Sequence, residues 1–136
     1  MEVQNEEQRM RQLNKHKRIL IVDDGEVNRI LMGKALSKRG YEVQTAVDGV
    51  DGFEKYLQDK YDCILMDIEM PKKNGIELTR AIRIFEQEKN LKKTPIIAVT
   101  TKPDTFKDTC LNAGMQNFIP KPVLGDTLAR LVEQSV

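Results

Sequence analysis

Aspartate residues follow two apolar segments of the sequence. Asp67 comes directly after the apolar run 63–66, and the pair Asp23 and Asp24 follows the predicted strand 17–22, which is apolar from Ile19 to Val22. Short apolar runs of this kind are typical of buried strands in a parallel sheet. Open α/β sheets place their ligands in the crevice beyond the carboxyl ends of such strands. A carboxylate at that point can act as a nucleophile, which makes Asp67 the candidate reactive residue.

These carboxylates also form a candidate metal site. At ~4 Å a pair of like charges costs about 4 kcal/mol at an intermediate dielectric constant, so the cluster must hold protons or bind a cation. A site of oxygen ligands without histidine or paired cysteine suits Mg²⁺. Asp23, Asp24 and Asp67 are therefore predicted magnesium ligands. The alternative is that Asp23 or Asp24 only caps the next helix.

Two further polar residues follow predicted strands. Thr100 comes after the apolar run 95–99, and Lys121 lies between two prolines after the run 117–119. A carboxylate, a divalent metal, a hydroxyl and an ammonium together can receive a phosphoryl group, because the donors and the metal offset charge on its oxygens. The product would be an aspartyl phosphate on Asp67. Each residue taken alone is also compatible with an ordinary strand end or a solvated lysine.

Alternating strands and helices are needed to bring these residues together. The predicted strands are 17–22, 41–47, 63–66, 95–99 and 117–119, and the predicted helices are 26–39, 49–57, 75–88, 104–113 and 124–133. Five such repeats with short connections indicate an α/β fold, a doubly wound parallel sheet in one domain. The flavodoxin-like (βα)5 strand order 2-1-3-4-5 makes the first and third strands neighbours, so their terminal carboxylates meet.

Composition narrows the class of protein. The chain has 136 residues, 40% hydrophobic and 32% charged, with a formal net charge of +1. This balance gives no electrostatic basis for nucleic-acid binding, and no apolar stretch approaches the roughly 20 residues of a membrane span. Cys63 and Cys110 lack metal-ligand spacing and are expected to be reduced thiols in a cytoplasmic protein.

The polar segment 1–16 precedes the first predicted strand. It is expected to be a solvated tail, either a frayed helix or disordered chain. Val3, Met10 and Leu13 also fit a and d positions of a heptad repeat, which would make the segment a coiled-coil linker helix. The predicted domain then spans 17–136.

The chain from about residue 17 to 133 resembles the receiver domains of response regulators in two-component signalling. Receivers of hybrid histidine kinases and phosphorelays are the most similar. The residues that carry the resemblance are Val22-Asp23-Asp24, Met66-Asp67-Ile68-Glu69-Met70-Pro71 with Asn74-Gly75, Ala98-Val99-Thr100-Thr101, and Lys121-Pro122.

The resemblance implies a role for each site residue. Asp67 would take a phosphoryl group from a phosphohistidine, with Mg²⁺ held by Asp23 or Asp24, by Asp67 and by the backbone carbonyl of Glu69. Thr100 and Lys121 would assist, and Thr100 with Phe118 would form the switch. Glu69 and Lys102 occupy the positions that tune dephosphorylation.

It also implies the protein's partners and its class. The partner would be a histidine kinase or a histidine phosphotransfer protein, docked on the first predicted helix through residues such as Asn28 and Met32. The domain would be a cytoplasmic signalling switch, not a turnover enzyme, although it assists its own phosphorylation and slow dephosphorylation. A phosphorylation-dependent dimer, and a place within a longer kinase, stay open.

The sequence departs from the usual receiver pattern at several positions. Gly25 stands where asparagine is common, and Thr101 where alanine is common, which predicts a looser first loop and tighter access to Asp67. Phe118 lacks the hydroxyl of tyrosine, so its rotamers would differ by packing alone. Glu69 and Lys102 carry opposite charges, and we hypothesise that they pair across the site and hinder water.

Three other functions remain as alternatives. A phosphohydrolase of the haloacid-dehalogenase type would want a second aspartate two places after Asp67, where this chain has Glu69. A receiver-like scaffold would bind partners without phosphorylation. A flavin or nucleotide binder would want a glycine-rich loop after the first strand, where Asp23 and Asp24 stand instead.

Overall fold

The computed structural model describes residues 2–70, 74–123 and 125–136 of the chain. Pro71, expected in the turn after Asp67, and Leu124, expected at the start of the last helix, lie outside the described residues.

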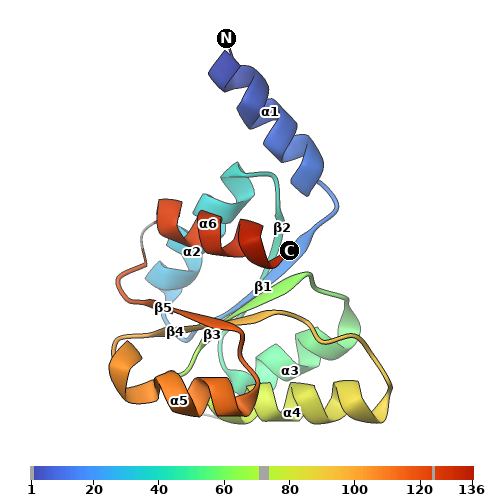
Figure 1. The fold of residues 1–136 in the computed structure, drawn as a ribbon, viewed down its shortest axis with the longest axis vertical. Coiled ribbons are helices and arrows are strands. Elements are labelled where there is room, and N and C mark those ends of the chain that lie inside the picture. The colour runs from blue at the N-terminus through green and yellow to red at the C-terminus, as the bar shows by residue number, and fades with distance from the viewer. Residues whose placement is uncertain (1, 71–73, 124) are drawn as a thin grey trace.

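Five strands alternate with helices along the described chain (Figure 1). The strands are β1 (Arg18–Val22), β2 (Glu42–Ala46), β3 (Cys63–Asp67), β4 (Ile96–Thr100) and β5 (Asn117–Pro120). The helices are α1 (Glu2–Asn14), α2 (Glu26–Lys38), α3 (Gly49–Gln58), α4 (Gly75–Glu88), α5 (Pro103–Ala113) and α6 (Gly125–Ser135). Each predicted strand and helix is present with boundaries within two residues, and the predicted helix 75–88 coincides with α4.

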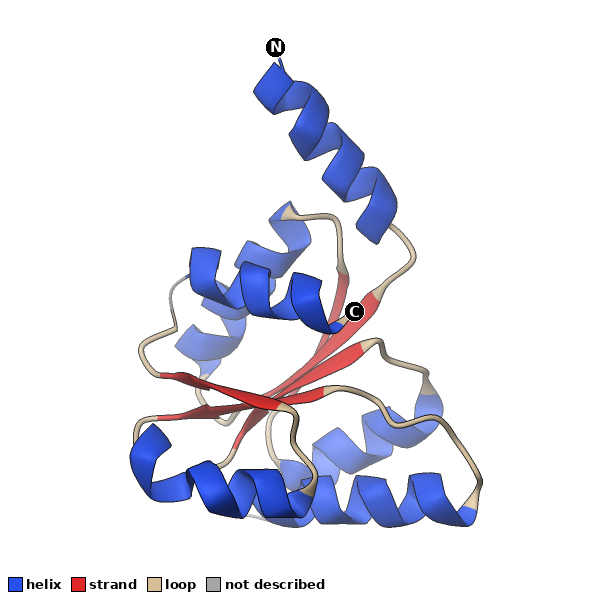
Figure 2. Cartoon of the chain, in the orientation of Figure 1, coloured by secondary structure: helices blue, strands red, loops and turns tan. Residues whose placement is uncertain are grey.

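The strands form one parallel sheet in the order β2-β1-β3-β4-β5, which confirms the predicted topology. Helices α2 and α6 cover one face, and α3, α4 and α5 cover the other (Figure 2). Both faces of the sheet are therefore buried, which is why the central strands are almost continuously apolar.

Alternate residues of each strand contribute to two separate cores. In β1, Leu20 and Val22 face the core under α3, α4 and α5, whereas Ile19 and Ile21 face the core under α2 and α6. This alternation follows from the period of two residues in a strand. The sheet is thus held rigidly at its centre, and the ends of its strands can carry polar groups.

Helix α2 buries only some of the apolar residues that recur at helical spacing in its sequence. Leu36 is fully buried, whereas Val27, Ile30 and Leu31 are 68%, 47% and 59% exposed. Met32 and Leu36 are the buried residues of α2. The prediction of an exposed Met32 at a docking surface is therefore wrong. The apolar residues of the helix are not confined to one side, so only contact with the sheet and α6 decides which of them are buried.

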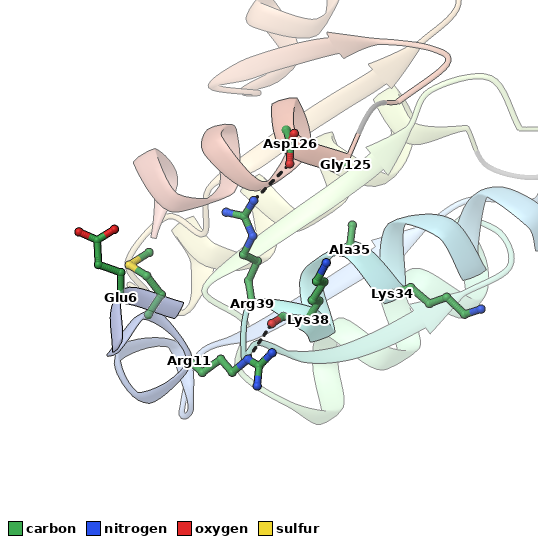
Figure 3. A pocket seen from close by; sticks show the side chains of 9 residues that line it. Glu6, Arg11, Lys34, Ala35, Lys38, Arg39, Gly125 and Asp126 are labelled. Atoms are coloured by element: carbon green, nitrogen blue, oxygen red, sulfur yellow. Dashed lines mark hydrogen bonds and ion pairs between the residues drawn. The ribbon is translucent and has the colours of Figure 1, made fainter. Parts of the chain in front are cut away.

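Helix α1 extends away from the sheet (Figure 1), and its last turn forms hydrogen bonds with the carboxyl end of α2. The buried side chain of Asn14 donates from Nδ2 to the carbonyl oxygen of Arg39 at 2.8 Å. Arg11 Nε donates to Lys38 O at 3.2 Å (Figure 3). Gly40 has a φ of +96°, and a Cβ there would lie 2.7 Å from the Arg11 backbone. A pocket of about 620 Å³ lies between α1, α2 and α6.

Replacing Asn14 with alanine is expected to destabilise α1 by roughly 1 kcal/mol, because the carbonyl of Arg39 loses this donor. Amide hydrogen exchange along α1 should become several-fold faster while exchange in the sheet stays unchanged. The exposed Gln12→Ala is the matched control. Equal exchange in α1 of the Asn14→Ala variant and the wild type would show that the helix is not held by this contact.

The two cysteines are free thiols, in agreement with the sequence. Both are buried, and burial raises the pKa of Cys63 to about 12. Neither thiol is therefore prone to ionise or react at neutral pH. Among the described residues, no helix combines the length and the hydropathy that a membrane span requires.

Candidate functional site

Asp23, Asp24 and Asp67 meet at the carboxyl end of the sheet. Strands β1 and β3 are neighbours with Val22 opposite Met66, so the residues that follow these positions lie side by side. Carboxylate oxygens of the three aspartates lie within 4.8 Å of one another. Asp23 and Asp67 are buried, whereas Asp24 is exposed.

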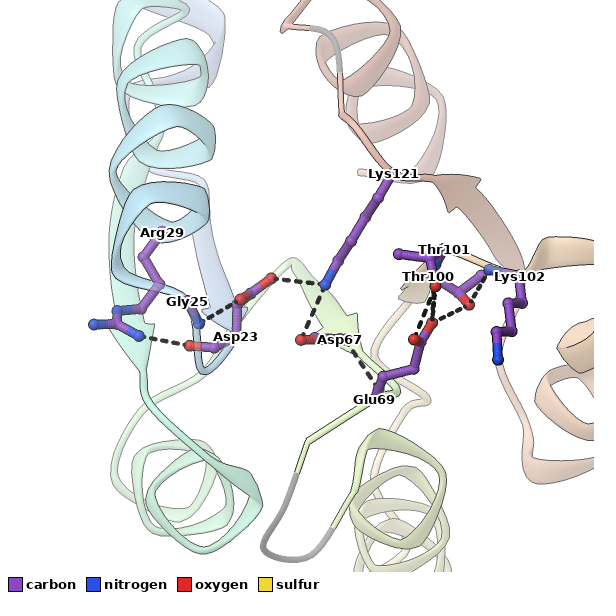
Figure 4. Close-up of polar contacts among 9 residues, drawn as sticks. All are labelled: Asp23, Gly25, Arg29, Asp67, Glu69, Thr100, Thr101, Lys102 and Lys121. Atoms are coloured by element: carbon purple, nitrogen blue, oxygen red, sulfur yellow. Dashed lines mark hydrogen bonds and ion pairs between the residues drawn. The ribbon is translucent and has the colours of Figure 1, made fainter.

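The ammonium of Lys121 faces both buried carboxylates (Figure 4). Its Nζ lies 3.2 Å from Asp67 Oδ2 and 3.8 Å from Asp23 Oδ2. The other oxygen of each aspartate accepts a backbone hydrogen bond, from Glu69 N at 2.9 Å and from Gly25 N at 2.8 Å. Asp23 Oδ2 and Asp67 Oδ2 accept no hydrogen bond from the described residues. The single positive charge of Lys121 therefore lies next to two buried carboxylates.

The pKa of Asp67 is raised to about 6, mainly by burial and to a smaller extent by the charge of Asp23, although the Glu69 N–H and Lys121 lower it. Ionisation of Asp67 is therefore less favourable in the folded protein than in the unfolded chain. Two buried carboxylate oxygens without hydrogen bonds, next to an exposed third carboxylate, form a donor set that suits a hard divalent cation. The residues present therefore fit Mg²⁺.

Thr100 and Lys121 come from the next two strands along the sheet. Asp67 pairs with Val99 in the register of β3 and β4, so Thr100 lies one residue beyond it at the same edge. Lys121 follows β5, and its backbone N–H donates to Thr100 O at 2.8 Å. The structure thus brings Asp23, Asp24, Asp67, Thr100 and Lys121 to one edge of the sheet.

The comparison with protein families matches residues 19–133 to the response regulator receiver domain. The chain belongs to this family. It is 38% identical over 119 residues to hybrid signal transduction histidine kinase F of Dictyostelium discoideum, and 39% identical over 123 residues to histidine protein kinase 1 of Candida albicans. These matches cover 86% and 85% of the chain but only 11% and 5% of the kinases.

Solved receiver domains have the same fold. A chemotaxis response regulator of Vibrio cholerae is 31% identical with a TM-score of 0.80, covering 88% of this chain and 98% of that one. The receiver domain of the sensor histidine kinase PA1611 from Pseudomonas aeruginosa is 32% identical with a TM-score of 0.78, covering 88% and 96%. That structure has a magnesium ion coordinated in its active site cleft. Family membership excludes the phosphohydrolase and the flavin-binder alternatives.

In this receiver domain Glu69 does not pair with Lys102, so that hypothesis is wrong. Oxygen Oε1 of Glu69 instead accepts from Thr100 Oγ1 at 2.6 Å and from Thr101 N at 2.8 Å. The Thr100 hydroxyl and then the Thr101 donors lower the pKa of the Glu69 carboxyl. These contacts form because β3 and β4 are neighbouring strands that end side by side. The sequence shows only that Glu69 and Lys102 have opposite charges, which suggested an ion pair instead.

Arg29 is a site residue that the sequence pattern did not indicate. Its Nη1 donates to the backbone carbonyl of Asp23 at 2.8 Å, and its backbone N–H donates to Gly25 O at 3.0 Å. The side chain thereby ties α2 to the loop that carries both acidic residues after β1. A Cβ on Gly25 would lie 3.2 Å from Asp23 Oδ1, so this loop has little spare room.

The expected switch residue Phe118 is partly buried and packs against the core under α3, α4 and α5. Lys107 Nζ of α5 lies 6.0 Å from the centroid of its ring, within cation–π range. The position of the ring therefore depends on an electrostatic contact as well as on packing. Its role as a switch stays a prediction.

Proposed function

We propose that Asp67 accepts a phosphoryl group from a phosphohistidine of a partner protein and that the domain thereby switches its protein interactions. The observation that carries the proposal is the environment of Asp67. Its carboxylate is buried at the sheet edge, faces Lys121 at 3.2 Å and keeps one oxygen without a hydrogen bond. Membership of the receiver family supports the same residue as the acceptor.

In the proposed transfer, an oxygen of Asp67 attacks the phosphorus of the donor. The P–N bond breaks, its electron pair stays on the imidazole nitrogen, and the ring leaves as neutral imidazole when its other nitrogen carries a proton. The product is an acyl phosphate on Asp67. Lys121 offsets charge on the transferred oxygens, and the Thr100 hydroxyl donates a hydrogen bond to one of them.

Asp23, Asp24, Asp67 and the backbone carbonyl of Glu69 would hold Mg²⁺. When bound, the ion neutralises charge on the transferred group. Thr100 then moves toward the phosphoryl group, and Phe118 occupies the space that Thr100 leaves. The two states of this switch differ around α5, β5 and α6, as in a two-state population shift. We also propose that the same residues support slow hydrolysis, with Glu69 and Lys102 setting its rate.

A histidine kinase or a histidine phosphotransfer protein is the proposed partner. Exposed Val27, Ile30 and Leu31 on α2 provide an apolar surface beside the acidic site, in place of the buried Met32.

We place the receiver domain at 17–136, with 1–16 as a linker helix, in the cytoplasm, where free thiols persist. Direct nucleic-acid binding forms no part of the proposal, and phosphorylation could promote a dimer.

Acetyl phosphate with Mg²⁺ is expected to add one phosphoryl group to the wild type, measured by intact mass. The gain should disappear in Asp67→Asn, because the amide is not a comparable nucleophile, and should fall strongly when Mg²⁺ is chelated. Unmodified wild type after exposure both to acetyl phosphate and to a phosphorylated histidine partner would contradict the proposal and favour a phosphorylation-independent scaffold.

A further inference from the structure

The side chain of Glu69 makes a dense set of contacts with the end of β4 (Figure 4). Its Oε1 accepts from Thr100 Oγ1 at 2.6 Å, from Thr101 N at 2.8 Å and from Thr101 Oγ1 at 3.1 Å. Its Oε2 accepts from Thr101 Oγ1 at 2.9 Å. An exposed glutamate could instead remain in solvent, so this geometry reflects a specific fit between the carboxylate and the donors of β4.

The proton of the Thr100 hydroxyl is fully used in this arrangement. Lys102 N donates to Thr100 Oγ1 at 3.0 Å, so the hydroxyl accepts from the backbone on one side and donates to Glu69 on the other. A hydroxyl has a single proton to donate. It cannot donate to Glu69 and to a phosphoryl oxygen at the same time.

The same donors lie at the edge where a phosphoryl group on Asp67 would be placed. Asp67 pairs with Val99, so the Thr100 hydroxyl and the Thr101 N–H follow immediately at the end of the adjacent strand. A carboxylate and a phosphoryl group are both anionic acceptors for such donors. Glu69 therefore accepts the Thr100 hydroxyl proton that the mechanism assigns to the transferred group.

We propose that Glu69 is an internal substitute for the phosphoryl group: its carboxylate holds Thr100 and Thr101 in the unphosphorylated domain and must leave before Asp67 can be phosphorylated efficiently. Glu69 is then a positioning residue that acts through Thr100, and it sets the rate of phosphoryl transfer. This inference rests on the proposed function, since it concerns access of the phosphoryl group to the same site.

Two physical effects give the expected direction. Release of Glu69 breaks its hydrogen bonds before the new ones form, and its negative charge opposes an incoming phosphoryl anion. Glu69→Ala removes both obstacles and should raise the rate constant for labelling by acetyl phosphate about tenfold, because one hydrogen bond to a charged group is worth roughly that factor. Glu69→Gln keeps an acceptor oxygen but removes the charge, so its rate should lie between the two.

The experiment measures labelling of the full chain by intact mass at several times, with acetyl phosphate and Mg²⁺. Glu77→Ala is the matched control, because Glu77 is an exposed acid in the first turn of α4 and forms no hydrogen bond with Thr100 or Thr101. Its rate should stay within twofold of the wild type. The amide ¹H–¹⁵N signal of Thr101 provides a readout that does not depend on phosphorylation, and it should shift in Glu69→Ala even with Asp67→Asn present.

The outcomes separate the two proposals. Faster labelling and a shifted Thr101 signal in Glu69→Ala, with an unchanged Glu77→Ala, support the substitute role. An unchanged or slower rate in Glu69→Ala, an unmoved Thr101 signal, or an equal gain in Glu77→Ala overturns it while the wild type is still labelled. If neither the wild type nor any variant accepts a phosphoryl group from acetyl phosphate or a phosphorylated histidine partner, the proposed function itself fails.

Discussion

Replacing Glu86 with alanine is expected to lower the free energy of unfolding by about 3–5 kcal/mol, which is the usual cost of leaving one member of a buried ion pair without its partner. Glu86 is 2% exposed in α4. Its carboxylate accepts from Arg83 Nη1 at 2.7 Å and from the backbone N–H of Thr94 at 2.7 Å. Alanine would leave both of these partly buried donors without this acceptor.

The contacts of Arg83 explain why the loss should extend beyond one helix. Its Nε and Nη2 donate to the carbonyl of Gly114 at 3.0 Å and 2.8 Å, and Nη2 also donates to Gln116 Oε1 at 3.1 Å. Gly114 ends α5 in the left-handed conformation. The Glu86 carboxylate thus orients the guanidinium that joins α4 to the end of α5 and the start of β5.

Urea-induced unfolding measures the effect of the Glu86 substitution. The exposed Glu88→Ala on the same helix is the control and should change stability by less than about 0.5 kcal/mol. A cost below 1 kcal/mol for Glu86→Ala would show that the network contributes little. Because Thr94 precedes β4, the network lies at the end of the sheet opposite the acidic site, so labelling of the folded variant by acetyl phosphate should be unchanged.

Asp67→Asn is expected to stabilise the metal-free domain by about 3 kcal/mol at neutral pH. The folded pKa of Asp67 is raised to about 6 from an ordinary value of 3.8, and each unit corresponds to about 1.4 kcal/mol. The folded state therefore binds a proton more tightly than the unfolded chain. Asparagine replaces the buried charge with a neutral group of similar shape.

The sign of the pH dependence follows from the raised pKa. Below about pH 4, Asp67 is protonated in both states and costs nothing, so the variant and the wild type should be equally stable. As the pH rises from about 4 through about 6, ionisation of the buried Asp67 lowers the stability of the wild type but not that of Asp67→Asn. The difference in stability between the two proteins should therefore reach its full size near pH 7. Saturating Mg²⁺ should then reduce the gap by stabilising only the wild type.

Thermal or urea unfolding of both proteins at several pH values, with and without Mg²⁺, tests this expectation. Asp108→Asn is the control for removing one charge, because Asp108 is an exposed aspartate in α5. Equal stability of Asp67→Asn and the wild type at pH 7 without metal would contradict the cost assigned to the buried charge. The cost itself is typical of functional sites, where ionised groups are buried at the expense of stability.

Local pattern was sufficient to predict the fold and the composition of the site. The apolar runs that became β1, β3 and β4 are short, continuous and bounded by polar residues, which distinguishes buried parallel strands from helices. Helix α4 could be predicted to the residue, because Asn74 caps one end through Glu77 N and the charged loop follows the other. Since parallel strands end at the same edge, strand order alone placed Asp67 beside Asp23.

Other features depended on contacts between segments far apart in the chain. The apolar residues of helix α2 are not confined to one side, so only the sheet and α6 decided that Met32 is buried and Leu31 exposed. In the sequence, Glu86 stands in a charged segment and has no feature that sets it apart from a surface glutamate. In the fold it is buried and accepts hydrogen bonds from Arg83 and from the backbone of Thr94. Periodicity describes one element at a time and cannot specify which face a neighbour will cover.

The partner of Glu69 was likewise decided by the tertiary structure. In the sequence, the opposite charges of Glu69 and Lys102 were the visible signal, and they suggested an ion pair. In the fold, β4 ends beside β3 with the Thr100 hydroxyl and the Thr101 N–H aimed at the carboxylate. Backbone and hydroxyl donors carry no signature in charge patterns, because their direction exists only once the strands are paired. The sequence therefore determined which groups meet at this edge, and the tertiary structure determined which of them bind each other.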